Sequence, residues 1–124
     1  MPYSILIADD NPVVRQTLRM CLERSAEWVV CGEAEDGLEA VEKARQLRPD
    51  LVILDLSMPG MNGLDAARTL KLETPSARLL MFTSFKNPSL EREAVAAGCI
   101  ALVAKSEMGV LFSTIRRLVS GDKD

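Results

Sequence analysis

Polar side chains that can bind a cation or a phosphoryl group follow four short apolar segments of the chain. The segments cover residues 5–8, 51–54, 79–82 and 100–103, and the polar residues behind them are Asp9 and Asp10, Asp55, Thr83 and Lys105. If the segments are parallel strands, their carboxyl ends meet at one edge of a sheet, where ligands of open α/β proteins bind. The sequence therefore predicts that three carboxylates, a hydroxyl and an ammonium lie close together.

Three converging carboxylates repel one another and resist burial unless a cation neutralises them. Because hard divalent ions prefer oxygen ligands, the cluster of Asp9, Asp10 and Asp55 predicts a magnesium site. An ammonium and a hydroxyl beside that site are the groups that neutralise and orient phosphoryl oxygens. The chemistry predicted for this edge is phosphoryl transfer to a carboxylate.

Five apolar runs are expected to form the strands that position these side chains: residues 5–8, 28–31, 51–54, 79–82 and 100–103. They are nearly continuous rather than alternating, which is typical of a parallel sheet covered on both faces. The segments between them carry apolar residues at helical spacing, such as Val14, Leu18, Cys21 and Leu22. Five strand–helix repeats predict one α/β domain with right-handed crossovers.

Proline, glycine and capping residues mark the expected ends of the helices. Asp10 or Asn11 is expected to cap the first helix, just before Pro12. The other markers are Pro49 after the second helix, Pro88 at the start of the fourth and Gly98 at its end.

The order of these residues resembles the receiver domains of two-component response regulators. The matching positions span nearly the whole chain: Asp9, Asp10, Asp55, Thr83, Lys105 and the loop Met58-Pro59-Gly60-Met61-Asn62-Gly63. The resemblance implies a flavodoxin-like (βα)5 fold, which is a doubly wound parallel sheet of five strands in the order 2-1-3-4-5. It also implies a receiver domain over residues 1–120 and a polar tail over 121–124, which would start a linker to an output domain.

By this resemblance Asp55 is the phosphorylation site, and a sensor histidine kinase supplies the phosphohistidine that Asp55 attacks. Asp10 and Asp55 would bind Mg²⁺ directly, and Asp9 would bind it directly or through a water molecule. Ser57 would add its main-chain carbonyl as a further ligand. Such a domain is a phosphoacceptor that assists its own phosphorylation and dephosphorylation, and it is not an enzyme acting on a separate substrate.

The resemblance also implies a catalytic set and a conformational switch. Lys105 would hold a phosphoryl oxygen beside Asp55, and Thr83 would follow the phosphoryl group on activation. The family often has Tyr or Phe at the second switch position, three residues before the lysine, where this chain has Leu102. The family often has proline after the lysine, where this chain has Ser106.

The Lys105-Ser106 pair and the Arg-Arg-Leu-Val-Ser-Gly segment at 116–121 are similar to receivers of NarL/FixJ-type transcription regulators. Such receivers continue into a helix-turn-helix domain, so a fused DNA-binding domain outside this chain is expected, with transcription as the output. A homodimer formed on phosphorylation through the last two helices is also expected, by resemblance alone.

The composition of the chain excludes or disfavours several other classes of function. The chain has 124 residues, no histidine and a formal net charge of −3, which excludes Ser–His and Cys–His catalysis and disfavours direct nucleic-acid binding. No apolar run approaches the roughly 20 residues of a membrane span. Three separated cysteines fit a reducing compartment better than a disulfide framework, so a cytoplasmic location is expected.

Other functions fit parts of the pattern. A phosphatase of the haloacid dehalogenase type needs a second acid two residues after the nucleophile, where this chain has Ser57. A flavodoxin-like binder of FMN needs a loop that binds phosphate after the first strand, where this chain has the acidic residues Asp9 and Asp10. Taken in isolation, these two aspartates would be interpreted as the N-terminal cap of a helix. A pseudo-receiver that binds a partner without phosphorylation is the alternative that Leu102 leaves open.

Overall fold

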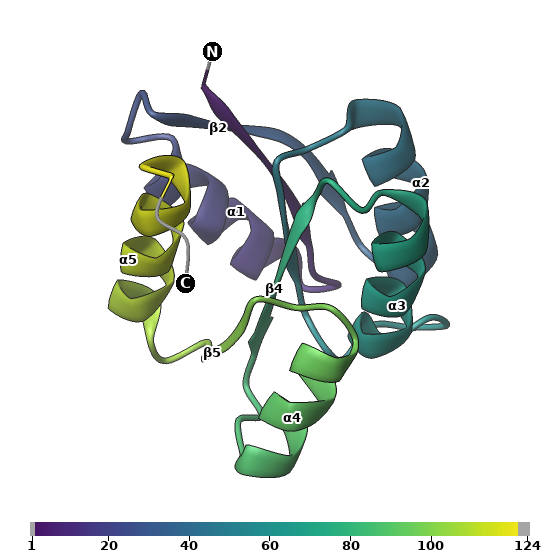
Figure 1. Cartoon of the computed structure of the whole chain (residues 1–124). Helices are drawn as coiled ribbons and strands as arrows, with labels where there is room; N and C mark the ends of the chain where they lie inside the picture. Colours follow the sequence, from purple (N-terminus) through teal and green to yellow (C-terminus); the bar gives the residue numbers. More distant parts are fainter. Residues whose placement is uncertain (1, 122–124) are drawn as a thin grey trace.

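The computed structural model describes residues 2–121, which form a five-stranded parallel sheet in the order β2-β1-β3-β4-β5. The strands are β1 (Tyr3–Ala8), β2 (Trp28–Ala34), β3 (Leu51–Leu54), β4 (Arg78–Thr83) and β5 (Ala101–Ala104). The helices are α1 (Pro12–Leu22), α2 (Gly37–Leu47), α3 (Gly63–Glu73), α4 (Pro88–Ala96) and α5 (Met108–Val119). A helix follows each strand, and Figure 1 shows the helices around the central sheet. The predicted flavodoxin-like fold and strand order are confirmed.

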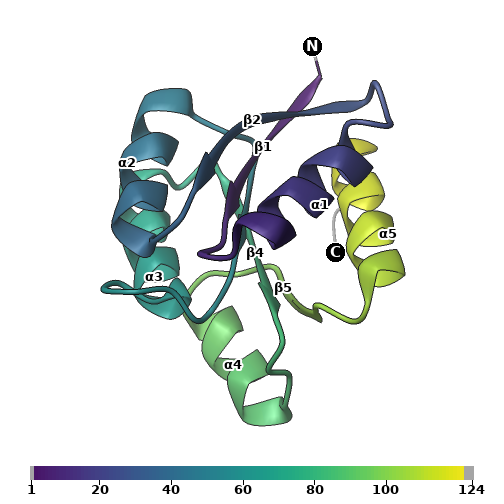
Figure 2. The same cartoon turned by 180° about the vertical axis from the view of Figure 1, so that it is seen from behind.

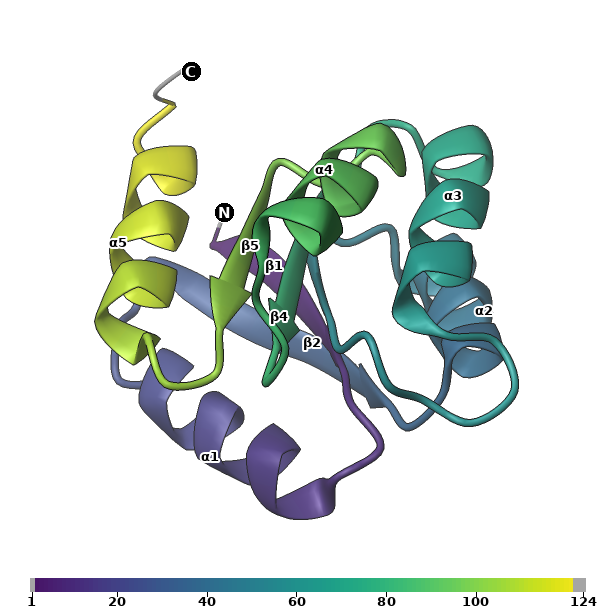
Figure 3. The same cartoon turned by 90° about the horizontal axis from the view of Figure 1, so that it is seen from below.

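Each face of the sheet carries its own hydrophobic core. On one face Ile7 belongs to a buried cluster with Leu18 of α1 and Ile115 of α5. On the other face Leu54 belongs to a cluster with Leu70 of α3 and with residues of α2 and α4. Figures 1 and 2 show α1 and α5 together on one side of the molecule and α2 and α3 together on the other, and Figure 3 shows α4 next to α3. Burial of both faces explains why the strand segments are continuously apolar.

The register between the last two strands decides which side chains share a face. Met81 pairs with Leu102, and Thr83 pairs with Ala104. Because side chains alternate along a strand, Thr83 lies on the same face as Met81. Leu102 and Met81 belong to the core cluster on the α4 side, so both predicted switch residues face α4.

Short polar side chains cap four helices, and they are Asn11, Asp36, Asn62 and Asn87. The cap of α1 is therefore Asn11, whose side chain accepts from the main-chain N–H of Val13 at 2.9 Å, and Asp10 does not serve as this cap. Arg48, in the left-handed region with φ 49°, ends α2 just before Pro49. Gly98, with φ 107°, follows α4, so both expected helix ends are confirmed.

Four strands differ from the expected apolar runs. β4 (Arg78–Thr83) extends one residue beyond the expected run 79–82 at each end. β1 begins at Tyr3, and β2 continues through a Gly-Glu-Ala segment to Ala34, because these stretches are only partly buried and break the apolar pattern. The expected strand at 100–103 is shifted by one residue, since Ile100 is partly exposed and Ala104 pairs with Thr83.

Residues 122–124 of the expected polar tail lie outside the described residues. Within the described range, none of the helices has the length and apolar character needed to cross a membrane.

Candidate functional site

Three carboxylates converge where β1 and β3 end. One oxygen from each of Asp9, Asp10 and Asp55 lies within 4.8 Å of the other two. Asp9 is only 2% exposed and Asp55 only 5%, whereas Asp10 is exposed. Two carboxylates of the predicted cluster, Asp9 and Asp55, are thus buried, and the third, Asp10, faces solvent.

Main-chain hydrogen bonds hold the two buried acids in place by extending the sheet one residue beyond its strands. The N–H of Asp9 donates to the carbonyl of Ala34 at 3.0 Å, and the N–H of Asp55 donates to the carbonyl of Ala8 at 2.9 Å. The Asp9 and Asp55 side chains therefore start from a rigid backbone, and their separation is set by the spacing of neighbouring strands.

Lys105, directly behind β5, bridges the two buried carboxylates. Its Nζ atom lies 2.8 Å from Oδ2 of Asp9 and 3.3 Å from Oδ2 of Asp55. The other oxygen of Asp9, Oδ1, accepts from the main-chain N–H of Asn11 at 2.9 Å. The structure therefore brings the predicted lysine to the acidic residues, although the three lie on different loops.

Electrostatics within the cluster favours a cation. Burial raises the pKa of Asp55 above its ordinary value, the charge of Asp9 raises it further, and Lys105 opposes the rise. Burial alone would lower the pKa of Lys105, but Asp9 and Asp55 raise it, so the ammonium stays charged. One ammonium does not balance three carboxylates, so additional positive charge would stabilise the ionised cluster.

The donor set fits a hard divalent ion, because carboxylate oxygens are the ligands that Mg²⁺ prefers. Ser57, the predicted carbonyl ligand, is exposed in the loop between β3 and α3. In the same loop, Met58 belongs to the hydrophobic core and Met61 packs against that core. Both methionines of this loop therefore act as packing residues.

Thr83 is the last residue of β4 and is fully buried. Its hydroxyl accepts from the main-chain N–H of Phe85 at 3.2 Å, and its carbonyl accepts from the N–H of Lys105 at 2.8 Å. Leu102 is 8% exposed and belongs to the core cluster. Thr83 thus touches both the loop before α4 and the lysine of the site.

Gly63, to which no role was assigned from the sequence, allows α3 to approach the acidic cluster. A Cβ atom at this position would lie 2.2 Å from the main-chain oxygen of Asp55, far inside contact distance. The N–H of Gly63 also donates to the carbonyl of Leu56 at 2.9 Å. Its signal in the sequence is its place at the end of the Met58–Gly63 loop that carries the family resemblance.

Arg15, in the first turn of α1, also belongs to the site, although no pattern in the sequence predicted it. Its Nη1 atom donates to the main-chain oxygen of Asp9 at 2.6 Å. No pattern of residue types identifies such a contact, because the acceptor is a backbone atom in a loop.

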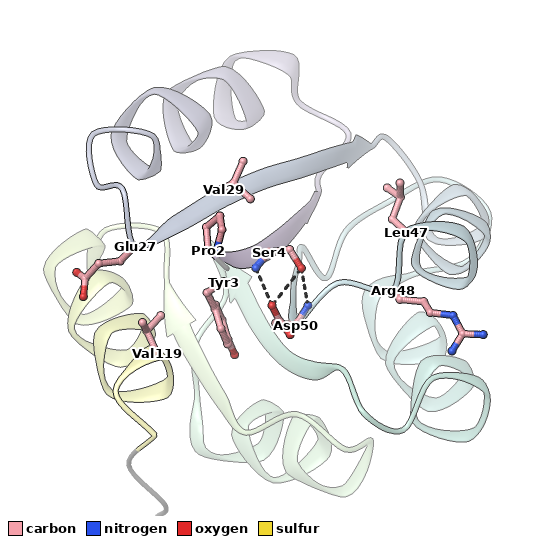
Figure 4. Close-up of a pocket in the computed structure, with 9 residues that line it drawn as sticks. All are labelled: Pro2, Tyr3, Ser4, Glu27, Val29, Leu47, Arg48, Asp50 and Val119. Atoms are coloured by element: carbon pink, nitrogen blue, oxygen red, sulfur yellow. Dashed lines mark hydrogen bonds between the residues drawn. The ribbon is translucent and has the colours of Figure 1, made fainter.

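A hollow of about 680 Å³ lies at the opposite edge of the sheet. Figure 4 shows the residues that line it, among them Tyr3, Arg48 and Asp50. Pro2 and Val119, from near the two ends of the described chain, also line it. The Asp50 carboxylate accepts from both the N–H and the hydroxyl of Ser4, at 2.8 and 3.2 Å. Ser4 and Asp50 are thus hydrogen-bonded to each other, and the residues of the acidic cluster lie at the other edge of the sheet.

Residues 5–116 match the family model of the response regulator receiver domain. The matched range includes the three aspartates, Thr83 and Lys105.

Individual relatives share the sequence and the fold. The transcriptional regulatory protein LnrK of Bacillus subtilis is 38% identical over 101 residues, which are 82% of this chain and 46% of LnrK. The chemotaxis protein CheY of Thermotoga maritima is 36% identical over 105 residues, which are 85% of this chain and 87% of CheY. A LuxR-family two-component response regulator from Aurantimonas sp. SI85-9A1 superposes with a TM-score of 0.92 at 32% identity, covering 99% of this chain and 89% of that chain. The chain spans about half the length of the transcriptional regulators that it matches.

Proposed function

The chain belongs to the response regulator receiver family, and we propose that its Asp55 accepts a phosphoryl group from the phosphohistidine of a sensor kinase. The reaction requires Mg²⁺, and the phosphorylated domain changes conformation to control an output. The observation that carries the proposal is a buried carboxylate, Asp55, with an ammonium 3.3 Å away and two further carboxylates within 4.8 Å.

Asp55 is suited to act as the nucleophile. Burial in a rigid frame holds its carboxylate at one position, so the entropy of positioning is lost before the donor arrives. In the reaction a carboxylate oxygen attacks phosphorus, and the P–O bond of an acyl phosphate forms. The P–N bond to the donor imidazole breaks, and the imidazole nitrogen keeps the electron pair and takes up a proton.

Lys105 is suited to hold an oxygen of the incoming phosphoryl group. Its ammonium already lies between Asp9 and Asp55, so a small movement of the flexible side chain transfers the contact from a carboxylate to the new group. Thr83 is buried at the same edge, where its hydroxyl accepts from the N–H of Phe85 and can donate its own proton to a phosphoryl oxygen.

Asp9, Asp10 and Asp55 would hold the magnesium ion, with the carbonyl of Ser57 as a further ligand. When bound, Mg²⁺ supplies positive charge that neutralises the phosphoryl oxygens. Asp10 is exposed, so a hydrated ion can reach this side of the cluster from solvent.

The output that we propose is transcription, through a DNA-binding domain of the NarL/FixJ type joined beyond a receiver domain over residues 1–120. LnrK, which this chain resembles, is a transcriptional regulatory protein of about twice the length. The location that we propose is the cytoplasm, which agrees with three free cysteines. A homodimer through α4 and α5 on phosphorylation belongs to the same proposal, and sedimentation with and without phosphodonor tests it.

Intact-mass spectrometry tests the central step. Incubation with acetyl phosphate and Mg²⁺ is expected to add one acid-labile phosphate to the protein, and Asp55→Asn is expected to add none. Asp55→Asn keeps the shape of the side chain, so circular dichroism should show an unchanged fold.

Two outcomes would contradict the proposal. Stoichiometric labelling of Asp55→Asn would move the acceptor to another residue. A wild-type protein that stays unlabelled by acetyl phosphate and by phosphorylated kinases would favour the pseudo-receiver alternative.

A further inference from the structure

We propose that Arg15 is a positioning residue that fixes the loop between β1 and α1 in the shape that binds Mg²⁺. This inference rests on the proposed function, because it concerns the same acidic cluster. Arg15 does not contact the phosphoryl group, and it acts through the backbone of Asp9.

The guanidinium of Arg15 connects three parts of the molecule. The side chain starts on α1, its Nη1 atom donates to the main-chain oxygen of Asp9 at 2.6 Å, and its Nε atom lies 3.0 Å from Oε1 of Glu33 on β2. The side chain is only 15% exposed, so water competes weakly for these bonds. A planar guanidinium can make both contacts at fixed angles, which an ammonium cannot do.

Glu33 is itself held firmly, which makes it a suitable support. Its second oxygen, Oε2, lies 2.7 Å from Nε of Arg19, and its main-chain oxygen accepts from Nζ of Lys43. Burial would raise the pKa of Glu33, but its hydrogen bonds with Arg19 and Arg15 lower it below the ordinary value. The carboxylate is therefore ionised at neutral pH, and Arg15 binds to a side chain that is already positioned.

Asp9 is consequently restrained at four atoms. Its N–H donates to Ala34, its carbonyl accepts from Arg15, and its two carboxylate oxygens contact the N–H of Asn11 and the ammonium of Lys105. Arg15 supplies the restraint on the peptide group that joins Asp9 to Asp10. The orientation of this peptide determines where the exposed Asp10 carboxylate begins, so losing the restraint would let Asp10 leave the cluster.

Charge and position predict opposite effects of removing Arg15. By charge alone, loss of a cation near three carboxylates should strengthen Mg²⁺ binding. If Arg15 positions the loop, its loss should weaken binding, because outer partners of metal ligands typically contribute about 10–100-fold to affinity. The sign of the change therefore separates the two roles.

The test compares Arg15→Gln with Arg19→Gln in thermal-shift titrations with MgCl₂ at constant ionic strength. Both substitutions remove one positive charge and one ion pair to Glu33, but only Arg15 binds the carbonyl of Asp9. We expect the dissociation constant for Mg²⁺ to rise about tenfold in Arg15→Gln and to stay equal or fall in Arg19→Gln. Arg15→Lys, which can make only one of the two contacts, is expected to lie between wild type and Arg15→Gln, and it carries the test if Arg15→Gln does not fold.

The outcomes distinguish this inference from the proposed function. Equal or tighter Mg²⁺ binding by Arg15→Gln, with wild-type binding intact, would overturn the role of Arg15 and leave the phosphorylation site standing. Equal weakening in Arg15→Gln and Arg19→Gln would make the effect one of Glu33 alone and would also overturn it. A wild-type protein without a Mg²⁺-dependent shift would remove the metal site, and the role of Arg15 with it.

Discussion

At the scale of single residues, Gly63 allows α3 to lie close to Asp55, the proposed phosphate acceptor. A Cβ atom there would lie 2.2 Å from the Asp55 carbonyl, so Gly63→Ala must displace either the helix or the backbone of Asp55. We expect the free energy of unfolding to fall by about 1–3 kcal/mol, as for other overpacked sites. Urea denaturation measures this change.

Gly109 in α5 provides a matched control. It is also a glycine in a helix, but a Cβ atom there has no neighbour within 4 Å. Gly109→Ala should therefore stabilise the protein by up to about 1 kcal/mol, because alanine favours the helix. If both substitutions changed stability equally, the close contact at Gly63 would not be the cause.

Asp55 makes the stability of the metal-free protein depend on pH. Burial raises its pKa in the folded state, so the native protein binds this proton more tightly than the unfolded chain does. The contribution of Asp55 favours folding at low pH and is lost as pH rises through the unfolded pKa and then the folded pKa. In EDTA, Asp55→Asn should therefore become progressively more stable than wild type between acidic and neutral pH. Denaturation curves at several pH values measure this, and a constant difference would contradict it.

At the scale of elements, the end of β4 is linked to two loops that can move together. The hydroxyl of Thr83 accepts from the N–H of Phe85. Lys86, the next residue along the chain, places its Nζ atom 2.9 Å from Oε1 of Glu107, which lies in the loop before α5. The same Glu107 oxygen accepts from the N–H of Ala104 at 3.1 Å. A displacement of Thr83 is therefore expected to reach both α4 and α5.

Thr83→Ala should leave phosphorylation of Asp55 largely intact and reduce the conformational change that accompanies it. Thr83→Ser keeps the hydroxyl and should retain most of the change. Amide resonances of Lys86 and Glu107, followed by NMR as acetyl phosphate is added, provide the measurement. Shifts in Thr83→Ala that match those of wild type would exclude Thr83 from the switch.

The interior elements could be predicted from the sequence better than the edges. β3 has the predicted bounds because both of its faces are buried and all four residues are apolar. β2 was expected to be shorter, because Glu33 interrupts the apolar pattern while its carboxylate binds Arg15 and Arg19. Partial exposure at an edge strand permits polar residues, and the pattern then no longer marks the end of the strand.

Some residues of the candidate site could also be predicted from the sequence and others could not. Asp9, Asp55 and Lys105 could be predicted to meet because the carboxyl ends of parallel strands share one edge. Arg15 and Gly63 could not, because each lies against a backbone oxygen of a residue several positions earlier in the sequence. Such contacts depend on how the helices and strands pack against each other, and residue type and spacing in the sequence do not predict this packing.

At the scale of the whole molecule, the acidic cluster is expected to couple the proposed metal binding to folding. Repulsion among three carboxylates costs stability when no cation is present, so Asp10→Ala should raise the melting temperature in EDTA. If Mg²⁺ binds only the folded cluster, as proposed, it should stabilise wild type by about 1.4 kcal/mol at roughly ten times its dissociation constant. Asp10→Ala should lose most of this gain in a thermal-shift titration.

Glu73→Ala is a suitable control, because Glu73 lies at the far end of α3 in an exposed ion pair with Arg45. Exposed pairs contribute little to stability, so this variant should keep the full Mg²⁺ response. A full response in Asp10→Ala as well would mean that the exposed aspartate is not a ligand.

The hollow at the edge opposite the acidic cluster brings the two ends of the described chain together. Pro2 and Val119 line this one hollow (Figure 4), so a short flexible linker could join the ends in a circular permutant. The exposed turn at Pro75 and Ser76 offers a place to reopen the chain, just before β4. Because the order of elements along the chain would change while every strand kept its neighbours, the permutant should still assemble the acidic cluster. The ends of the described chain and the acidic cluster lie at opposite edges of this sheet. The position of the termini can therefore be changed without altering the residues of the cluster.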